Sequence, residues 1–570
     1  MNRKAQNVLL VVASIACLTL LVRMVPSFTE KTKSIIPDRK PLILRGKKHK
    51  QTQASSRHLI DKYHAQRPTS ALDDPIPNRH GSEHDARLVV NLGPETDRIP
   101  DELLISFKSV EDMRAFLENV RGSGLTIIDS SERLLVVRLQ AFSPEELAQY
   151  FDSDHLPENI SGNHLVYTPN LPEQRQLSTH QNYSSFGING PHWLGINRQA
   201  SEGGSGILVA VLDTGVENHE TIDPTRFSRI DLVGESNDVD GDFAGHGTAV
   251  AAIIAGQASY APGMAPNVDI LSIRVLDDAG VGNSFTVAEG IMVAVEQGAE
   301  VINLSLGSFA DSPILKKTVE YALSQGVVLV AATGNDGISE IMYPARYDGV
   351  IAVGAVDAQK QVLPFSNQGR EIDLTAPGFG VQTAWSDNQI VSFSGTSASA
   401  AFVSGAIADL LSDSQSLTAQ EAAVIVQNFV DDGGGPGKDE QYGNGILNYR
   451  RISERNTPGI YDIAVGGYFF SKTVTWDNNM TVPIVITIQN RGTESIQQVR
   501  AVITVDGQKE EYVISKIEAG KSIGISSNID VHKLMTGNSC VVTAEVYPTT
   551  SSDLYPGNNM LRTIVTLKSE

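Results

Sequence analysis

Four polar side chains of the kinds used in acyl transfer stand in glycine- and alanine-rich surroundings along this 570-residue chain. They are Asp213 at the end of "ILVAVLD", His246 in "GHGTAVAAIIAG", Asn335 in "VVLVAATGNDG" and Ser397 in "SGTSASAA". Hydrolysis by a hydroxyl nucleophile needs a base, a group that orients the base, and donors for the developing oxyanion. Because serine, histidine, aspartate and asparagine fill those roles, the four residues together predict nucleophilic hydrolysis.

Each of these residues, taken alone, has an ordinary structural explanation. An aspartate after a buried strand is often a turn former, and Asn-Asp-Gly or Gly-Thr-Ser segments are commonly plain turns. A histidine that opens a helix serves in many proteins as a cap or a metal ligand. The joint order of the four residues, with their flanking glycines and alanines, favours one shared site.

The elements that must position these residues are alternating strands and helices between residues 185 and 455. Apolar runs such as "VDILSIRVL", "AEVINLSLG" and "VIAVGAV" are separated by helical patterns such as "SFTVAEGIMVAVEQG". This pattern predicts an α/β domain with a mostly parallel sheet covered by helices on both faces. Ligands collect at the carboxyl ends of such strands, where Asp213 and Asn335 fall. Ser397 follows Gly395 at the start of a small-residue helix, whose dipole would assist developing negative charge.

These segments resemble the subtilisin-like serine proteases, the subtilases, over residues 185–455. The order Asp, His, Ser is the order found in subtilisin. The resemblance implies that Ser397 attacks the peptide carbonyl, that His246 acts as general base and then acid, and that Asp213 orients the imidazolium. It also implies an oxyanion hole formed by the Ser397 backbone N–H and the Asn335 side-chain amide. The chemistry would then require no cofactor.

The resemblance extends to residues that would bind an extended peptide substrate. "NLSLGS" matches one substrate-binding edge and "DDAGVGNSF" the opposite one, although plain sheet edges are the alternative for both. Met342 falls where many relatives place a small residue in the primary pocket, so we expect a shallow pocket that favours small or medium apolar side chains. The implied substrate-binding residues are Ser305, Leu306, Gly307, Gly280, Gly282, Gly334 and Met342.

The chain also departs from the family pattern in ways that bear on helix geometry and on calcium. Ala401 stands where the family usually has proline, and because alanine is a good helix former we expect the helix geometry to survive. "HETI" at residues 219–222 weakens the expectation of the family's commonest calcium site. In "NDVDGD", Asp238, Asp240 and Asp242 offer alternating carboxylates that suit a structural calcium ion, with a hydrated acidic turn as the alternative.

The beginning of the chain has the pattern of a targeting segment. A basic start, "MNRKAQ", precedes the apolar run at residues 8–22, so residues 1–25 predict a signal peptide or a membrane anchor. The basic cluster that follows would keep an uncleaved anchor's downstream side in the cytoplasm, and membrane attachment stays open. We nevertheless expect an extracytoplasmic protein, secreted or membrane-anchored. Residues 26–98 are polar and basic, which predicts a linker without regular structure.

The charge of the chain bears on its partners. The formal net charge is −21, although residues 1–68 are basic, so the rest of the chain is strongly acidic. An acidic body repels phosphate backbones, and this excludes nucleic acid as an expected partner. A protein or peptide substrate is the partner that the resemblance implies.

Residues 99–175 predict a small separate domain. The order strand, helix, hairpin, helix, strand is that of a ferredoxin-like α+β unit. The unit resembles the inhibitory propeptides of subtilases, which implies an intramolecular inhibitor that caps the cleft until it is cut. We expect self-cleavage in the polar connector "NLPEQRQLSTHQNYSSF" at residues 170–186. A small accessory domain is the alternative.

Residues 460–570 show a different sequence pattern, which is typical of short strands joined by Gly, Asn and Asp turns. This pattern predicts an Ig-like β-sandwich, and the segment resembles the CARDB-like adhesion repeats. Taken together with the sequence features, these resemblances imply an exported serine endopeptidase that is made as a self-processed zymogen. The alternative is a catalytically silent, subtilase-like adhesion or binding protein.

Overall fold

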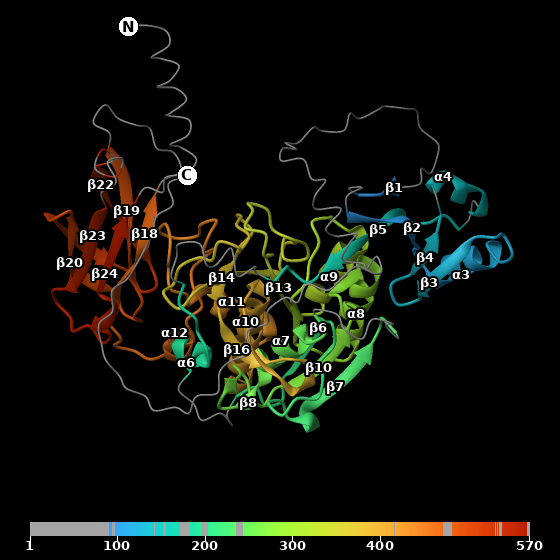
Figure 1. Ribbon diagram of the computed structural model, residues 1–570, viewed down its shortest axis with the longest axis horizontal. Helices are drawn as coiled ribbons and strands as arrows, with labels where there is room; N and C mark the ends of the chain where they lie inside the picture. Colours follow the sequence, from blue (N-terminus) through green and yellow to red (C-terminus); the bar gives the residue numbers. More distant parts are fainter. Residues whose placement is uncertain are drawn as a thin grey trace, which may run out of the picture.

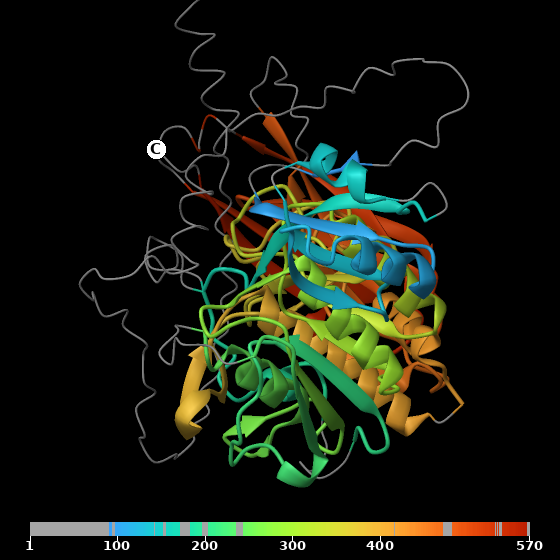
Figure 2. The ribbon, with the colours of Figure 1, turned by 90° about the vertical axis from the view of Figure 1, so that its right-hand side faces the viewer.

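The computed structural model describes residues 90–566, without 94–96, 142, 152–154, 172–182, 197–202, 235–242, 415, 471–480, 531, 533 and 535–538. The described residues form three units, and the N-terminal and C-terminal units lie at opposite ends of a central one (Figure 1). Figure 2 looks along this row from the N-terminal unit. The predicted leader at residues 1–25 lies outside the described residues. Within the described part, no helix is both long enough and apolar enough to cross a bilayer.

The central unit is built on one parallel sheet, with strand order β15-β14-β13-β12-β6-β10-β7. Most of these strands are buried along their whole length, as expected for β-branched runs that are covered on both faces. The parallel sheet predicted from residues 185–455 is therefore confirmed. Its strands are β6 (Leu208–Asp213), β7 (Phe227–Asp231), β10 (Asp269–Arg274), β12 (Val301–Leu304), β13 (Val328–Ala332), β14 (Ile351–Val356) and β15 (Leu374–Pro377).

Helices cover both faces of this sheet. On one face, α7 (His246–Ala255), α10 (Thr396–Asp413) and α11 (Ala419–Asn428) share a core with Val209 and Val211 of β6. On the other face, α8 (Ser284–Glu296) and α9 (Pro313–Ser324) pack with Ala210 and Leu212. The alternation follows from the two-residue period of a strand. Residues 396–411 of α10 are all buried, because small side chains let this helix lie deep against the sheet.

The N-terminal unit has its elements in the predicted order of strand, helix, hairpin, helix and strand. Its sheet has the strand order β1-β5-β2-β4-β3. In α3, the Ser109 side chain caps the helix by accepting from the Asp112 N–H, and Met113 and Phe116 are buried against the sheet. The elements are β1 (Val90–Asn91), β2 (Arg98–Ser106), α3 (Val110–Asn119), β3 (Thr126–Ser131), β4 (Val136–Gln140), α4 (Pro144–Leu147) and β5 (Asn159–Tyr167).

Strand β1 corrects one prediction about the linker. Val90 and Asn91 pair in parallel with Ile160 and Ser161 of β5, although residues 26–98 were expected to lack regular structure. A two-residue strand has no detectable period, so only its partner strand reveals it. The N-terminal unit therefore reaches back at least to residue 90.

The C-terminal unit consists of two antiparallel sheets that share one apolar core. One sheet has the order β18-β19-β22 and the other the order β21-β20-β23-β24. Isoleucine and valine side chains from both sheets meet between them, for example Ile484, Val499 and Val542. The strands are β18 (Ile463–Phe470), β19 (Thr481–Asn490), β20 (Ile496–Val505), β21 (Gln508–Ile517), β22 (Ser522–Asp530), β23 (Cys540–Pro548) and β24 (Met560–Val565).

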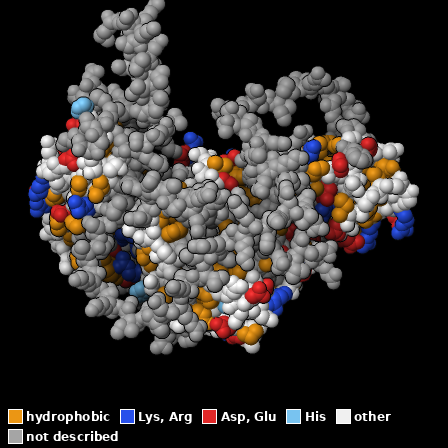
Figure 3. All heavy atoms as spheres, viewed as in Figure 1, with side chains coloured by type: hydrophobic (Ala, Val, Ile, Leu, Met, Phe, Trp, Pro, Cys, Tyr) orange, Lys and Arg blue, Asp and Glu red, His pale blue; other side chains and the backbone are white. Residues whose placement is uncertain are grey.

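A group of charges joins the C-terminal unit to the central one, and its members are buried except for the partly exposed Lys360. The carboxylate of Asp431 lies 2.8 Å from Lys360 Nζ, 3.1 Å from Arg491 Nη1 and 3.9 Å from Arg451 Nη1. Arg491 directly follows β19, whereas the other three residues precede the C-terminal strands in the sequence. We call these four residues the junction cluster. On the outer surface, by contrast, blue and red side chains are interspersed at both ends of the molecule (Figure 3).

Candidate active site

Asp213 and His246 meet at the carboxyl end of the central sheet. Asp213 is the last residue of β6, and His246 is the first residue of α7. The imidazole Nδ1 lies 2.8 Å from Oδ1 and 3.0 Å from Oδ2 of the carboxylate, and both side chains are buried. The Thr214 N–H also donates to Asp213 Oδ1, at 2.7 Å. Since Nδ1 faces the carboxylate, Nε2 is the ring nitrogen that is left to accept a proton.

A glycine allows the two elements to come this close. A Cβ atom on Gly247 would lie 2.2 Å from the carbonyl oxygen of Gly215 and 3.2 Å from the Asp213 Cβ. Any larger residue at this position would push the first turn of α7 away from β6. The His246 ring also contacts Phe393 edge-on, with 5.3 Å between ring centroids, and Phe243 at 6.0 Å. The backbone approach and the two aromatic rings therefore fix the imidazole beside Asp213.

Ser397 is the second residue of α10, at the helix end where backbone N–H groups lack partners within the helix. Its cap residue, Gly395, has φ +146°, and a Cβ there would lie 2.9 Å from Asn335 Nδ2. The Ser397 Oγ is buried and makes no hydrogen bond with any described group. A nucleophile needs a hydroxyl that is not engaged by another group, and the Ser397 hydroxyl meets that requirement.

The Asn335 amide is oriented by the residue that precedes Ser397. Asn335 Oδ1 accepts from both the backbone N–H and the Oγ of Thr396, each at 2.9 Å. Because the oxygen is used in this way, Nδ2 must be the outward donor, and it donates to the Asn170 carbonyl oxygen at 2.9 Å. The Gly334 N–H in turn donates to Thr396 Oγ, at 3.3 Å. The sequence prediction overlooked Thr396, although its place in "GTS" beside Ser397 was a usable signal.

An extended peptide segment lies against the edge predicted from "NLSLGS". Tyr167 exchanges two backbone hydrogen bonds with Gly307, both 2.9 Å long. The Leu306 side chain points the other way, into the core shared with α8 and α9. Ser305 contributes its hydroxyl to the interior rather than to the peptide, since it donates to the Ser397 carbonyl at 3.2 Å. Gly307 is therefore the residue of this edge whose backbone pairs with the peptide.

The opposite predicted edge, β11 (Val281–Asn283), holds the same segment from its other side. Residues 165–167 pair with β11 in antiparallel fashion, and Gly282 lies opposite Val166. The Thr168 N–H donates to the Gly280 carbonyl at 2.9 Å. The peptide thus forms the middle strand between two edges, the arrangement known as β-augmentation. We call residues 165–170 the edge-bound segment.

A chain of buried hydrogen bonds links the Ser397 carbonyl to the end of strand β12. Ser404 Oγ donates to Asn303 Oδ1 at 2.9 Å, and Asn303 Nδ2 donates to Ser305 Oγ at 2.9 Å. Ser305 then donates to the Ser397 carbonyl, so α10 is tied to β12 and the residue after it at Ser397 and again at Ser404. Sequence reasoning did not find Asn303 or Ser404, because a buried asparagine and serine carry no signal until their partners are known.

Met342 is fully buried in a small apolar cluster with Tyr167, Val281 and Phe309. A Cβ atom added to Gly334 would lie 2.9 Å from the Met342 sulfur, so the thioether fills the space beside that glycine. Met342 thus occupies the space beside Gly334, the residue that precedes Asn335 in the sequence.

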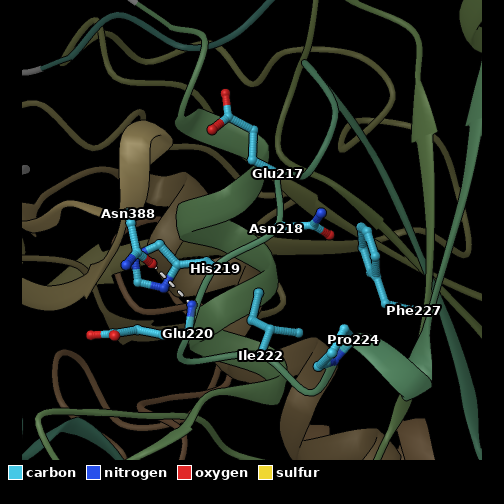
Figure 4. A pocket seen from close by; sticks show the side chains of 8 residues that line it. All are labelled: Glu217, Asn218, His219, Glu220, Ile222, Pro224, Phe227 and Asn388. Atoms are coloured by element: carbon cyan, nitrogen blue, oxygen red, sulfur yellow. Dashed lines mark hydrogen bonds between the residues drawn. The ribbon is translucent and has the colours of Figure 1, made fainter.

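The predicted calcium ligands Asp238, Asp240 and Asp242 lie outside the described residues. Within the described residues there is no group of three or more His, Cys, Asp or Glu that could hold a metal ion. Near residues 219–222 there is a hollow of about 350 Å³, in which Glu217 and Glu220 point apart (Figure 4). Both ring nitrogens of His219 are engaged there, by Thr221 Oγ and the Gln389 carbonyl.

Comparisons with known proteins identify the family to which the chain belongs. Residues 204–445 match the model of the subtilase family, the S8 peptidases. The alkaline elastase YaB of Bacillus sp. strain YaB is 31% identical over 361 residues, which are 63% of this chain and 93% of that protein. Subtilisin DY of Bacillus licheniformis is 37% identical over 257 residues, 44% of this chain and 92% of that protein. The chain belongs to the subtilase family.

This subtilase is accordingly a serine endopeptidase, and the chemistry of its family requires no cofactor. Its fold also resembles that of fervidolysin from Fervidobacterium pennivorans, a keratinolytic enzyme related to subtilisin. The TM-score is 0.55 at 15% sequence identity, and the match covers 85% of this chain and 97% of the other. At that identity the likeness concerns the fold alone.

The orientation of the Asn335 amide leads to a first prediction. The Asn335→Ala variant is expected to lower kcat by about 10²- to 10³-fold and to change KM little, because the lost donor acts on charge that develops in the transition state. Steady-state kinetics on a peptide substrate measure this split. The Asn367→Ala variant tests whether any nearby buried asparagine would give the same result, since Asn367 bonds only to backbone around the same loop. An unchanged kcat in Asn335→Ala contradicts the role.

Proposed function

We propose that this subtilase hydrolyses peptide bonds through a triad of Asp213, His246 and Ser397, with Asn335 as a donor to the oxyanion. The observation that carries the proposal is the Asn335 amide bound to a backbone carbonyl of an extended segment. Asp213 and His246 are hydrogen-bonded to each other and the Ser397 hydroxyl has no partner among the described residues, which supports the same proposal.

In the proposed reaction, His246 Nε2 takes the proton of Ser397 Oγ as that oxygen attacks the substrate carbonyl carbon. The Asn335 Nδ2–H and the Ser397 backbone N–H donate to the resulting oxyanion. Asp213 stabilises the imidazolium and keeps its ring in the orientation in which Nε2 faces the reaction. His246 then gives the proton to the leaving amine, and water hydrolyses the acyl-enzyme by the same steps.

We further propose that the N-terminal unit, predicted at residues 99–175, is an inhibitory prodomain with a ferredoxin-like fold. Its strand order β5-β2-β4-β3, with every neighbouring pair antiparallel, supports that fold. Arg133 forms an ion pair with Glu289 and another, 2.7 Å long, with Glu296, both on α8. Leu104 and Leu134 share a small apolar cluster with Phe285 of the same helix.

The remaining domain assignments belong to the same proposal. Residues 185–455 form the catalytic domain, and residues 460–570 form an Ig-like, CARDB-like sandwich, a fold that two sheets around one core support. Residues 1–25 act as a signal peptide or membrane anchor and residues 26–98 largely as a linker, so the enzyme works outside the cytoplasm. Residues 238–242 remain the proposed place for a structural calcium ion.

The space filled by Met342 leads to a prediction about the residue on the amino side of the scissile bond. Among peptides that differ only there, those with Ala or Leu are expected to be cleaved with higher kcat/KM than those with Phe or Lys. The Met342→Ala variant is expected to raise kcat/KM for the Phe peptide by about 10-fold or more, because the volume of Cγ, Sδ and Cε is returned to the pocket. A strong preference of the unmodified enzyme for Phe or Lys contradicts this account.

The proposed function is tested by incubating the purified protein with an unfolded protein such as casein. We expect peptide fragments to accumulate in the wild-type reaction and not in that of the Ser397→Ala variant. Fragmentation by both proteins would assign the activity to another group, and fragmentation by neither would favour the silent binding protein.

A further inference from the structure

We infer that this chain cuts itself between Asn170 and Leu171, so that the released prodomain ends at Asn170. The inference rests on the proposed function and specifies the regulation of the same site: one bond, already held in the catalytic centre, separates the inhibited from the active form. The sequence alone placed the cut only somewhere within residues 170–186.

The edge-bound segment fixes which bonds can be attacked. Tyr167 uses both its N–H and its carbonyl with Gly307, and the Thr168 N–H is bonded to Gly280. Because the Tyr167 carbonyl is used in the ladder, the peptide bond that follows it is held away from the oxyanion donors. The segment therefore approaches the catalytic centre with its backbone register already set.

Asn170 is the residue whose carbonyl reaches the oxyanion donor. Its oxygen accepts from Asn335 Nδ2 at 2.9 Å, and the amide oxygen of Asn335 is fixed by Thr396, next to Ser397. The Asn170 side chain is held as well, since its Nδ2 donates to Asp336 Oδ1 at 3.3 Å. The backbone carbonyl and the side chain of Asn170 are therefore both held by hydrogen bonds. Two such contacts at one residue favour a specific binding position over an incidental approach of the chain.

Leu171 follows Asn170 on the carboxyl side of the proposed bond. Its partly buried side chain packs against the core that α7 and α10 share, whereas residues 165–167 pair with β11. The chain thus passes from the two substrate edges to the apolar core of the central unit within a few residues. The Asn170–Leu171 bond is the link between these two parts.

The step balances without any further reagent. Ser397 Oγ forms an ester bond with the Asn170 carbonyl carbon while its proton passes to His246. The bond between that carbon and the Leu171 nitrogen then breaks, and the nitrogen leaves as an amine with the proton from His246. Water hydrolyses the ester, which leaves a carboxylate on Asn170 and restores the Ser397 hydroxyl.

The test follows the masses of the first fragments formed by the full-length chain after refolding, with the Ser397→Ala chain as the uncut reference. The expected first N-terminal fragment ends at Asn170, and the matching C-terminal fragment begins at Leu171. A first fragment with any other C-terminus overturns the inference. Wild-type chains that stay uncut for hours yet cleave an added peptide also overturn it.

Two substitutions that exchange the amide and the carboxylate test the contact between the Asn170 and Asp336 side chains without loss of volume. Asn170→Asp places a second carboxylate against Asp336, which is expected to slow the cut at least about 10-fold by like-charge repulsion. Adding Asp336→Asn to that variant is expected to restore the rate to within about threefold. The Asn119→Asp variant, at an exposed position of helix α3 in the same unit, is the matched control and is expected to cut at the wild-type rate. Failure of the second substitution to rescue the first counts against the contact.

Failure of this inference and failure of the proposed function are distinguishable. If only the bond is wrong, the processed enzyme still hydrolyses an unrelated peptide while its fragments end elsewhere. If the triad is wrong, no peptide is hydrolysed and no fragment forms.

Discussion

The Ser397→Ala and His246→Ala variants are each expected to lower kcat by about 10⁶-fold, and the double variant is expected to lose no more than either single one. In the proposed mechanism the hydroxyl and the imidazole act as one unit: without the base the nucleophile keeps its proton, and without the nucleophile the base has nothing to activate. Asp213→Asn is expected to cost about 10⁴-fold, because the ring loses the partner that fixes its tautomer.

Steady-state kinetics on one peptide substrate measure all four variants. Ser399→Ala is the matched control, since Ser399 lies on the same buried helix but donates only to the carbonyls of Ala376 and Pro377. Its kcat is expected to stay within a few-fold of wild type. Additive losses in the double variant, or a comparable loss in the control, would mean that helix α10 is merely disturbed.

The Asp431→Ala variant is expected to destabilise the protein by about 3–5 kcal/mol, because it leaves three cations at a buried junction without their anion. The side chains of Asp431, Arg451 and Arg491 are only 6%, 3% and 3% exposed. Thermal unfolding in a Ser397→Ala background, where self-digestion is absent, measures the loss. Glu511→Ala removes a carboxylate from exposed pairs with Arg500 and Lys509 and is expected to leave the midpoint nearly unchanged.

The same cluster predicts how stability depends on pH. Burial alone would raise the pKa of Asp431, but the charges of Arg491, Lys360 and Arg451 outweigh it and hold that pKa well below its usual value. A group with a lowered folded-state pKa contributes stability above its unfolded value, near 4, and loses that contribution as the pH falls further. The stability difference between wild type and Asp431→Ala should therefore shrink as the pH is lowered below about 4. A constant difference would contradict the charge-based explanation.

The sequence was sufficient for the parts of the site that strand ends and helix starts determine. Asp213 ends a β-branched run and His246 opens an alanine-rich helix, so the topology of a parallel sheet brings them to one edge. Gly395 and the small residues after Ser397 likewise predicted a deeply buried helix, and α10 is one. These features have local signatures in the sequence, namely the spacing of apolar residues and the positions of glycines at turns.

What the sequence could not provide are contacts between distant residues that have no local signature. The hydrogen bonds from Ser404 through Asn303, the pairing of Tyr167 with Gly307, and the Asn170 carbonyl at Asn335 each join segments about 100 or more residues apart. The junction cluster is similar, because Arg491 and Lys360 look like ordinary surface charges until the fold buries Asp431 between them. The strand at Val90 was overlooked because two residues show no period.

The most direct test of the central claim is to treat the processed enzyme with a fluorophosphonate and to identify the modified residue by peptide mass spectrometry. We predict one modified serine, Ser397, and a rate of modification at least about 10³-fold lower in the His246→Ala variant, since the base activates that hydroxyl. Modification at another residue, or an unchanged rate without His246, would contradict the proposed triad.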